Sequence, residues 1–178
     1  MSNSNLPTAI AVVGAGTMGN GIAQTFATCG VKTFMVDVKQ EFLDRGLATV
    51  HKSLGKFVEK GTLTADVAER AKGLLTTTTD MGVMSQVDLC VEAVTENLEV
   101  KTKVFQAADA AMKPEAILAS NTSSISITVL GAKTRRADRV IGMHFMNPVP
   151  LMKLVEVIRG NDTSDATARA VETWSKAL

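Results

Sequence analysis

The chain has 178 residues, of which 46% are hydrophobic and 21% charged, and its formal net charge is +1. This length suits one domain with a sizeable core, and a nearly neutral chain has no strong field to attract nucleic acid or an anionic membrane. The start, MSNSNLPTAI, lacks the charged and apolar regions of a signal peptide, and no apolar stretch approaches the roughly 18 to 20 residues that would span a bilayer. We therefore expect a cytoplasmic protein without a nucleic-acid or membrane partner.

The first third of the chain has the pattern of a β-α-β unit. Residues 8–13, TAIAVV, are typical of a strand, and residues 20–29 carry apolar side chains at helical spacing and are followed by Gly30. Residues 31–38, VKTFMVDV, predict a second strand. Such a unit implies parallel strands joined by a right-handed crossover.

Residues 40–75 are helical in pattern, with a break where Thr62 or Thr64 could cap a second helix, so we expect a helical hairpin inserted after the second strand. The alternation then resumes, with strands at 74–80, 87–94, 116–120, 139–145 and 153–158 and helices at 98–111 and 126–132. A last helix follows Thr163. The predicted fold class is α/β, with a Rossmann-like, mostly parallel sheet and helices on both faces.

The two cysteines, Cys29 and Cys90, lie in apolar segments without metal-ligand spacing. We expect small buried hydrophobic residues of a reducing compartment, and no metal site.

The segment VVGAGTMGNG places Gly14, Gly16 and Gly19 in the spacing G-x-G-x-x-G, between a predicted strand and a predicted helix. The first glycine permits a tight turn, the second lets the backbone approach a pyrophosphate, and the third lets the helix pack close to the sheet. The helix N-terminus then presents free N–H groups to the phosphates. Asp37, at the end of the second strand, can accept both ribose hydroxyls and would repel a 2′-phosphate, which favours NAD over NADP. The alternative is a glycine turn followed by an ordinary aspartate.

His144 and Glu156 lie in VIGMHFMNPVPLMKLVEVI, residues 140–158, at equal distances in sequence from Pro150. If the chain reverses near NPVP and the two runs pair antiparallel, both side chains meet on the same face. A carboxylate bonded to one imidazole nitrogen fixes the tautomer and stabilises the imidazolium that forms when the other nitrogen takes a proton. This arrangement predicts a general base. The alternative is a core histidine with satisfied hydrogen bonds and an unrelated glutamate on an edge strand.

Four segments, GAGTMGNGIAQ, VEAVTENLEVK, SNTSS and HFMNPVPLMKLVEVI, follow one another along the chain. In order and spacing they resemble the NAD-binding domain of the L-3-hydroxyacyl-CoA dehydrogenases, particularly the 3-hydroxybutyryl-CoA type, over essentially the whole chain. The resemblance implies NAD as the cofactor and an acyl-CoA substrate whose 3-hydroxyl is oxidised reversibly to a 3-oxo group. Residues 1–178 would then form one NAD-binding domain, with the helical hairpin at 40–75.

The resemblance implies four catalytic residues. His144 is the expected base and Glu156 its partner, Ser123 is expected to hydrogen-bond the reacting oxygen, and Asn147 is expected beside the nicotinamide and the histidine. By composition alone, SNTSS equally suits a turn and capping cluster. The expected cofactor contacts are Gly14, Ala15, Gly16, Thr17, Met18, Gly19, Asp37, Glu96, Lys101, Ser123 and Asn147.

Two basic groups have alternative interpretations. Lys52, Lys56 and Lys60 recur at four-residue intervals and therefore share one helix face with Ser53, which without context predicts a solvated face. The resemblance instead assigns the hairpin to the coenzyme A part of the substrate, with Ser53, Lys56, Lys60 and also Ser123 as substrate contacts. The second group is expected to be a solvated connector or a phosphate contact, and comprises Arg135, Arg136 and Arg139.

In the family, a helical second domain follows, supplies homodimer contacts and closes over the substrate. The last predicted helix runs to Leu178 without a stop signal, so we expect this chain to be the first domain alone, binding NAD with weak or absent turnover. An exposed apolar surface is expected where the second domain would pack. Two alternatives stay open, a non-catalytic NAD-binding module and a dehydrogenase of small 2- or 3-hydroxy acids that lack coenzyme A.

Overall fold

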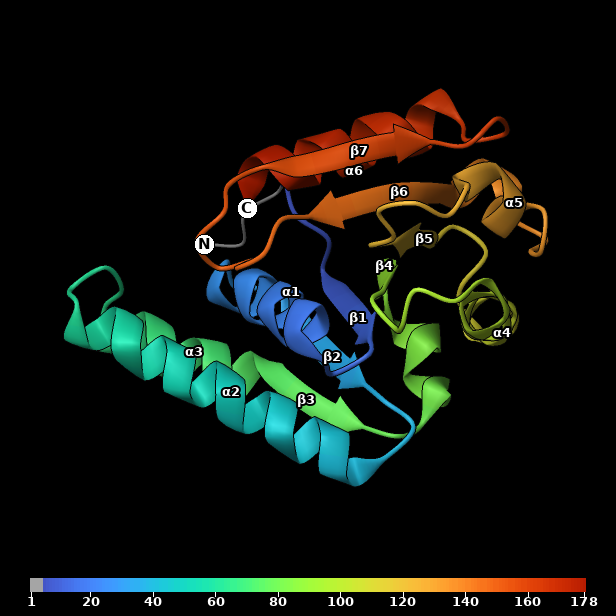
Figure 1. The fold of residues 1–178 in the computed structure, drawn as a ribbon. Coiled ribbons are helices and arrows are strands. Elements are labelled where there is room, and N and C mark those ends of the chain that lie inside the picture. The colour runs from blue at the N-terminus through green and yellow to red at the C-terminus, as the bar shows by residue number, and fades with distance from the viewer. Residues whose placement is uncertain (1–4) are drawn as a thin grey trace.

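The computed structural model describes residues 5–178, and Figure 1 shows their arrangement. In chain order the elements are β1 Ala9–Val13, α1 Thr17–Thr28, β2 Lys32–Val36, α2 Gln40–Glu59, α3 Ala65–Leu74, β3 Leu75–Thr78, the 3-10 helix η1 Met81–Gln86, β4 Leu89–Glu92, α4 Leu98–Ala111, β5 Ile117–Ser120, α5 Ile127–Gly131, the 3-10 helix η2 Ala137–Arg139, β6 Val140–Phe145, β7 Val155–Arg159 and α6 Asp165–Ala177.

The seven strands form one sheet in the order β3-β2-β1-β4-β5-β6-β7. All neighbouring pairs are parallel except β6 and β7, which are antiparallel. The predicted α/β class with a mostly parallel sheet is therefore confirmed. The strand order reverses between β1 and β4, and in open sheets of this kind ligands bind in the crevice outside the carboxyl ends of the strands at such a point.

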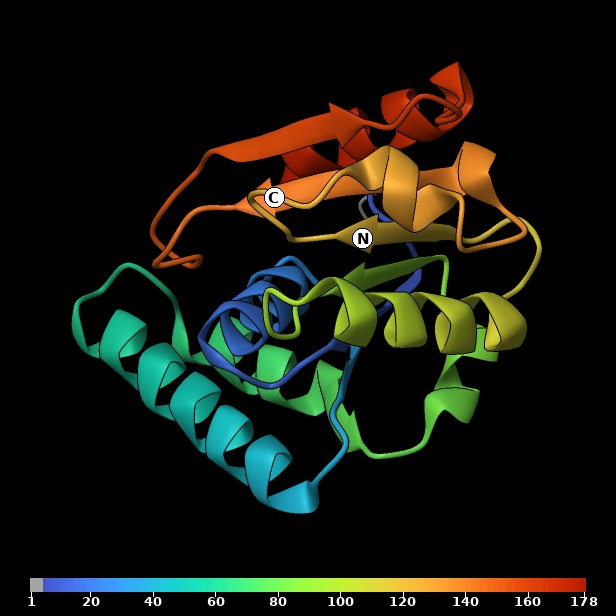
Figure 2. The same cartoon turned by 45° about the vertical axis from the view of Figure 1, so that its right-hand side comes forward.

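Helices cover both faces of the sheet, as Figures 1 and 2 show. Because side chains alternate along a strand, Ile10 and Val12 of β1 pack into one apolar cluster with α1, α2, α3 and α6. Ala11 and Val13 pack into the other cluster, with η1, α4 and α5. Because helices cover both faces of the sheet, the sequences of the parallel strands are nearly continuous apolar runs.

Most elements predicted from local sequence patterns are present in the structure. The hairpin of α2 and α3 is present, and the Thr64 side chain accepts the Val67 N–H at the start of α3, so Thr64 rather than Thr62 is the cap. Helix α4 has the predicted limits and is capped by Asn97. Helix α1 begins at Thr17, earlier than predicted, because the glycine turn itself passes directly into the helix.

The prediction of a solvated arginine connector is wrong for Arg136, which is only 8% exposed. Its Nε donates to Asp109 Oδ1 at 2.6 Å. Its two Nη groups donate to four backbone carbonyls at the end of α4 and the start of β5, those of Asp109, Met112, Lys113 and Ala116. The neighbouring Arg135 does have an exposed side chain, at 80%. Arg136 therefore joins α4 to the sheet.

Candidate active site

The glycine turn joins β1 to α1 at the point where the strand order reverses. Gly14 has φ +105°, and a Cβ there would lie 2.6 Å from the Ala93 carbonyl oxygen of the neighbouring strand end. A Cβ on Gly19 would lie 1.7 Å from the Gly14 carbonyl oxygen, so the helix can start this close to the strand only with glycine. At Gly16 a Cβ would meet nothing within 4 Å. Gly16 therefore borders open space, which suits the close approach of a ligand.

Helix α1 begins without a side-chain cap, with Gly16 at the N-cap position. The backbone N–H groups of its first turn, in Thr17 and Met18, precede the first intrahelical donor, Asn20, which bonds the Gly16 carbonyl at 2.9 Å. An uncapped helix N-terminus presents donors and a partial positive charge to an anion. The turn therefore fits the pyrophosphate of a dinucleotide.

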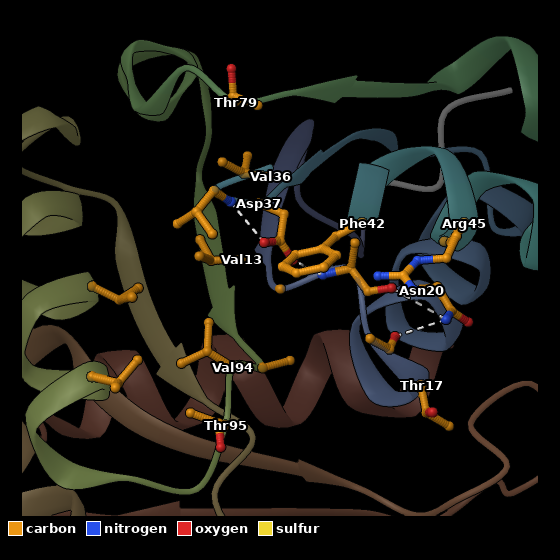
Figure 3. A pocket seen from close by; sticks show the side chains of 18 of the residues that line it. Val13, Thr17, Asn20, Val36, Asp37, Phe42, Arg45, Thr79, Val94 and Thr95 are labelled. Atoms are coloured by element: carbon orange, nitrogen blue, oxygen red, sulfur yellow. Dashed lines mark hydrogen bonds between the residues drawn. The ribbon is translucent and has the colours of Figure 1, made fainter. Parts of the chain in front are cut away.

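Asp37 is the first residue after β2 and lies beside the glycine turn. Its Oδ2 accepts the Ala15 N–H and its Oδ1 accepts the Val38 N–H, both at 2.7 Å. These two bonds hold the carboxylate at the edge of a cleft of about 680 Å³. Figure 3 shows the carboxylate in this cleft with Phe42 and Arg45 of α2 nearby. A carboxylate oxygen has further acceptor capacity, so Asp37 can still bond ribose hydroxyls.

The predicted reversal near NPVP is confirmed. Residue His144 in β6 pairs with Glu156 in β7, and the His144 Nδ1 lies 2.8 Å from the Glu156 Oε2. The loop between the strands packs on α1, where a Cβ on Gly21 would lie 2.9 Å from the Val149 Cβ. Because Glu156 occupies Nδ1, the Nε2 of His144 is the nitrogen left to exchange a proton.

Several predicted residues meet in a pocket of about 300 Å³, which is lined by Met18, Ala93, Val94, Glu96, Lys101, Asn121, Ser123, His144, Phe145, Met146 and Asn147. Ala93 and Val94 also line the large cleft beside the glycine turn, so the two cavities adjoin. A third cavity, of about 310 Å³, shares Ser123 and His144 and includes Glu156. The site therefore runs from Asp37 past the glycine turn to the histidine.

Glu96 and Lys101 reach this pocket differently. The Lys101 side chain is only 1% exposed, and its ammonium lies 2.7 Å from Glu92 Oε1 and 3.2 Å from Glu96 Oε2. Its third donor bonds the Val94 carbonyl at 3.3 Å. Glu96 is 41% exposed, so it is the member of the pair that can meet a ligand.

Burial works to raise the pKa of Glu96, yet that pKa lies below its usual value. Hydrogen bonds from Thr122 and Ser124 and the charge of Lys101 outweigh the desolvation. The Ser123 N–H also donates to Glu96 Oε1, at 3.3 Å. Glu96 is therefore an ionised acid that holds the segment carrying Ser123.

The predicted coenzyme A contacts lie apart from these cavities. Lys56 and Lys60 are exposed and Ser53 is half-buried, and none of the three lines the cleft or the two pockets beside His144. Lys60 caps the C-terminus of α2 at the tip of the hairpin. Figures 1 and 2 both show this tip projecting on the side where β6 ends and the loop to β7 begins. Their role as substrate contacts stays a prediction.

Four apolar residues of the β6–β7 loop and β7 are exposed, Leu151, Met152, Leu154 and Ile158. The first three line a groove of about 660 Å³ with the end of α6. An exposed apolar surface is expected where a second domain would pack, and that this groove is the surface stays a prediction.

Sequence reasoning missed Glu92, which is fully buried at the end of β4 and accepts the Ser120 hydroxyl at 2.6 Å. It also missed Asn121, whose Oδ1 accepts the Phe145 N–H at 2.8 Å and so ties the end of β6 to β5. The available signal for Glu92 was an acid inside the apolar run VDLCVEAV. A buried carboxylate needs partners, and that need could have predicted the Lys101 contact.

Within residues 5–178, no helix is long and apolar enough to cross a bilayer. The same part of the chain contains no group of three or more His, Cys, Asp or Glu that could hold a metal ion.

The mostly parallel sheet, the glycine turn at the reversal of strand order and the acid after β2 define a Rossmann-like dinucleotide-binding domain. A family model described as "3-hydroxyacyl-CoA dehydrogenase, NAD binding domain" matches residues 9–178. The chain belongs to this family, and its cofactor is NAD.

Several known proteins are similar over nearly the whole chain. A probable 3-hydroxybutyryl-CoA dehydrogenase of Deinococcus radiodurans is 53% identical over 94% of this chain and 60% of its own length. A 3-hydroxybutyryl-CoA dehydrogenase of Clostridioides difficile is 44% identical over 95% of this chain and 60% of its own length. The crystal structure of (S)-3-hydroxybutyryl-CoA dehydrogenase from Ralstonia eutropha superposes with a TM-score of 0.94, at 47% identity, over 96% of this chain and 60% of that one. The chain thus spans about 60% of the length of these relatives.

Proposed function

We propose that this chain is the cofactor-binding half of an NAD-dependent L-3-hydroxyacyl-CoA dehydrogenase, with a short-chain substrate of the 3-hydroxybutyryl-CoA type. The observation that carries the proposal is the 2.8 Å contact of His144 with Glu156 in a pocket that adjoins the dinucleotide cleft. A base at that end of the cleft is what the oxidation of an alcohol requires. The names of the relatives described above support the choice of substrate.

In the oxidative direction, His144 Nε2 removes the proton from the substrate's 3-hydroxyl. NAD, when bound, supplies the hydride acceptor. Glu156 holds the imidazole through Nδ1 and offsets the positive charge that develops on the ring. In the reverse direction, the imidazolium returns the proton to the 3-oxo group.

Ser123 and Asn147 complete the proposed constellation. Both line the same pocket as His144, and Ser123 also lines the neighbouring pocket that contains Glu156. The Ser123 hydroxyl would donate to the substrate oxygen and fix it within reach of His144. Asn147 would orient groups between the histidine and the nicotinamide.

The coenzyme A part of the substrate is assigned to the hairpin. Ser53, Lys56 and Lys60 would contact it, with the exposed ammonium groups acting as point charges toward the 3′-phosphate. This assignment is supported by the position of the hairpin tip on the side of the molecule where β6 ends.

We further propose a cytoplasmic location, and a homodimer for the whole protein, formed through a helical second domain. The share of the relatives that this chain spans, about 60%, supports a further domain in the complete enzyme. Light scattering on a longer chain that includes the second domain should give twice the monomer mass, and a monomer would contradict the dimer.

The function is tested by NADH oxidation with acetoacetyl-CoA, using the 178-residue chain with and without a separately supplied second domain. We expect NADH to bind in both cases, with turnover weak or absent alone and recovered on complementation. In the complemented enzyme, His144→Ala should lower turnover by roughly 10²-fold or more while the affinity for NADH scarcely changes.

Three outcomes would contradict parts of the proposal. Binding of NADH without activity under either condition would support a non-catalytic module. Equal activity with free acetoacetate would exclude a role for coenzyme A and support a dehydrogenase of small hydroxy acids. Equal losses of turnover and NADH affinity in His144→Ala would assign a structural role to the histidine.

A further inference from the structure

A charge cluster lies at the pocket that contains His144, and consists of Glu92, Lys101 and Glu96. Glu92 and Lys101 have side-chain exposures of 0% and 1%, and their charged atoms are 2.7 Å apart. Glu92 Oε1 also accepts the Val94 N–H at 2.7 Å, and its Oε2 accepts the Ser120 hydroxyl. Both Glu92 carboxylate oxygens and the Lys101 ammonium are thus held by short hydrogen bonds, so this pair is rigid and separated from bulk water.

Glu96 and Lys101 both line the pocket, and Glu96 is the exposed member of the cluster. Glu96 Oε2 lies 3.2 Å from the Lys101 ammonium, and Glu96 lines the pocket together with Met18, Ser123 and His144. The contacts from Thr122 and Ser124 lower its pKa, so it is ionised at neutral pH. Two carboxylates and one ammonium leave the cluster with one net negative charge.

The other charged groups at this end of the site do not cancel that charge. Glu156 has a side chain that is 52% exposed, and it is paired with His144, which is charged only when protonated. Arg159, which lines the neighbouring pocket, is paired with Asp165 at 2.7 Å. Lys103 lines the large cleft beside the glycine turn and not the pocket that contains His144.

We infer that the Glu92–Lys101–Glu96 cluster acts as an electrostatic selector of the cofactor's redox state, which raises the affinity for NAD⁺ relative to NADH. This inference rests on the proposed function, which assigns the pocket with His144 to the nicotinamide. The oxidised nicotinamide ring carries a positive charge and the reduced ring none, so a net negative cluster beside it stabilises only the oxidised form. Glu92 and Lys101 are almost fully buried and Glu96 is 41% exposed, so water and salt weaken the effect at Glu96 without abolishing it.

The selection has a consequence for the reaction. Because binding and redox equilibria are linked, any factor by which the protein favours the oxidised form makes the bound reduced form a stronger hydride donor by the same factor. The cluster therefore shifts the bound equilibrium toward reduction of a 3-oxo group, compared with the same site without its charge.

The test measures Kd for NADH by its fluorescence on binding, and Kd for NAD⁺ by competition against NADH. The quantity of interest is the ratio of Kd for NAD⁺ to Kd for NADH in the wild type and in Glu96→Gln, which keeps the side chain's size and removes its charge. We expect the ratio to rise roughly tenfold, which corresponds to about 1.4 kcal/mol, by weaker binding of NAD⁺.

Three further variants separate the effect of the charge from those of its contacts and its position. Glu96→Asp keeps the charge, so it should leave the ratio near the wild-type value even if both affinities fall. Glu99→Gln removes an exposed charge from the first turn of α4 that does not line the pocket, and should leave both affinities and the ratio unchanged. Glu92→Gln removes the buried charge and should raise the ratio as Glu96→Gln does. Should that variant not fold, Glu96→Gln alone decides, because its side chain is partly exposed.

The outcomes distinguish the inference from the proposed function. A wild-type chain that binds neither form of the cofactor would refute the proposed function and the inference together. Binding of both forms with a ratio unchanged in Glu96→Gln, or with equal changes in Glu96→Gln and Glu96→Asp, would refute the selector alone.

Discussion

Replacing Arg136 by methionine should destabilise the domain far more than an ordinary substitution at a helix-to-strand connection. The guanidinium makes five hydrogen bonds, one to the Asp109 carboxylate and four to backbone carbonyls. Methionine fills a similar volume but donates none of them. The change would leave the Asp109 carboxylate, whose side chain is 7% exposed, without its main partner, and the carbonyls at the end of α4 without donors.

The expected cost follows from this geometry. Removing one member of a buried ion pair typically costs about 3–5 kcal/mol, because the other charge stays buried. The stability of a whole domain is about 5–15 kcal/mol, so the loss is a large fraction of it. With a urea m-value of about 2 kcal/mol per molar, the midpoint of unfolding should fall by roughly 2 M.

Urea unfolding followed by circular dichroism would measure this shift, with Trp174 fluorescence as a second probe. Arg135→Met is the matched control, since that side chain is adjacent and also contacts Asp109, at 3.3 Å, but is 80% exposed. It should cost no more than about 1 kcal/mol. Similar midpoints for the two variants would refute the reasoning that burial of Arg136, and not its charge alone, supports the end of α4.

The remaining predictions concern an acid, two glycines and the thiols. Hydrogen bonds from Arg136 and Arg135, together with the Arg136 charge, outweigh desolvation and hold the pKa of Asp109 below its usual value. The carboxylate therefore stabilises the fold above the unfolded-state pKa, and this contribution is lost as pH falls through the lower folded pKa. Asp109→Asn should thus cost stability at pH 7 but progressively less toward pH 3, and a cost independent of pH in urea titrations would contradict the assignment. Gly19→Ala should lose NADH binding and much stability, because its Cβ would lie 1.7 Å from a carbonyl oxygen, whereas Gly16→Val should retain the urea midpoint and lose mainly NADH affinity. Equal midpoints for these two variants would be inconsistent with the structure. Burial raises the pKa of the Cys90 thiol, so Ellman's reagent should leave it unmodified in the native protein and react with it in urea. Rapid native modification of both cysteines would show that β4 is not packed as described.

Local sequence patterns determined the order of the elements and the nucleotide-binding turn. The glycine spacing, the apolar runs and the caps act over a few residues, so they predicted the β-α-β start, the hairpin after β2 and the limits of α4 without knowledge of the tertiary structure. The position of His144 opposite Glu156 was also predictable, because both residues lie at equal distances in sequence from Pro150, near which the chain reverses.

Only the tertiary structure decided the contacts between distant segments. Glu92, Lys101 and Ser120 come from β4, α4 and β5, and only the pairing of β4 with β5 and the packing of α4 bring them together. Arg136 looked solvated because its neighbours in sequence are polar, and its burial follows from the carbonyls at the end of α4. Charged side chains in such places depend on partners far along the chain, and a periodic pattern carries no information about those partners.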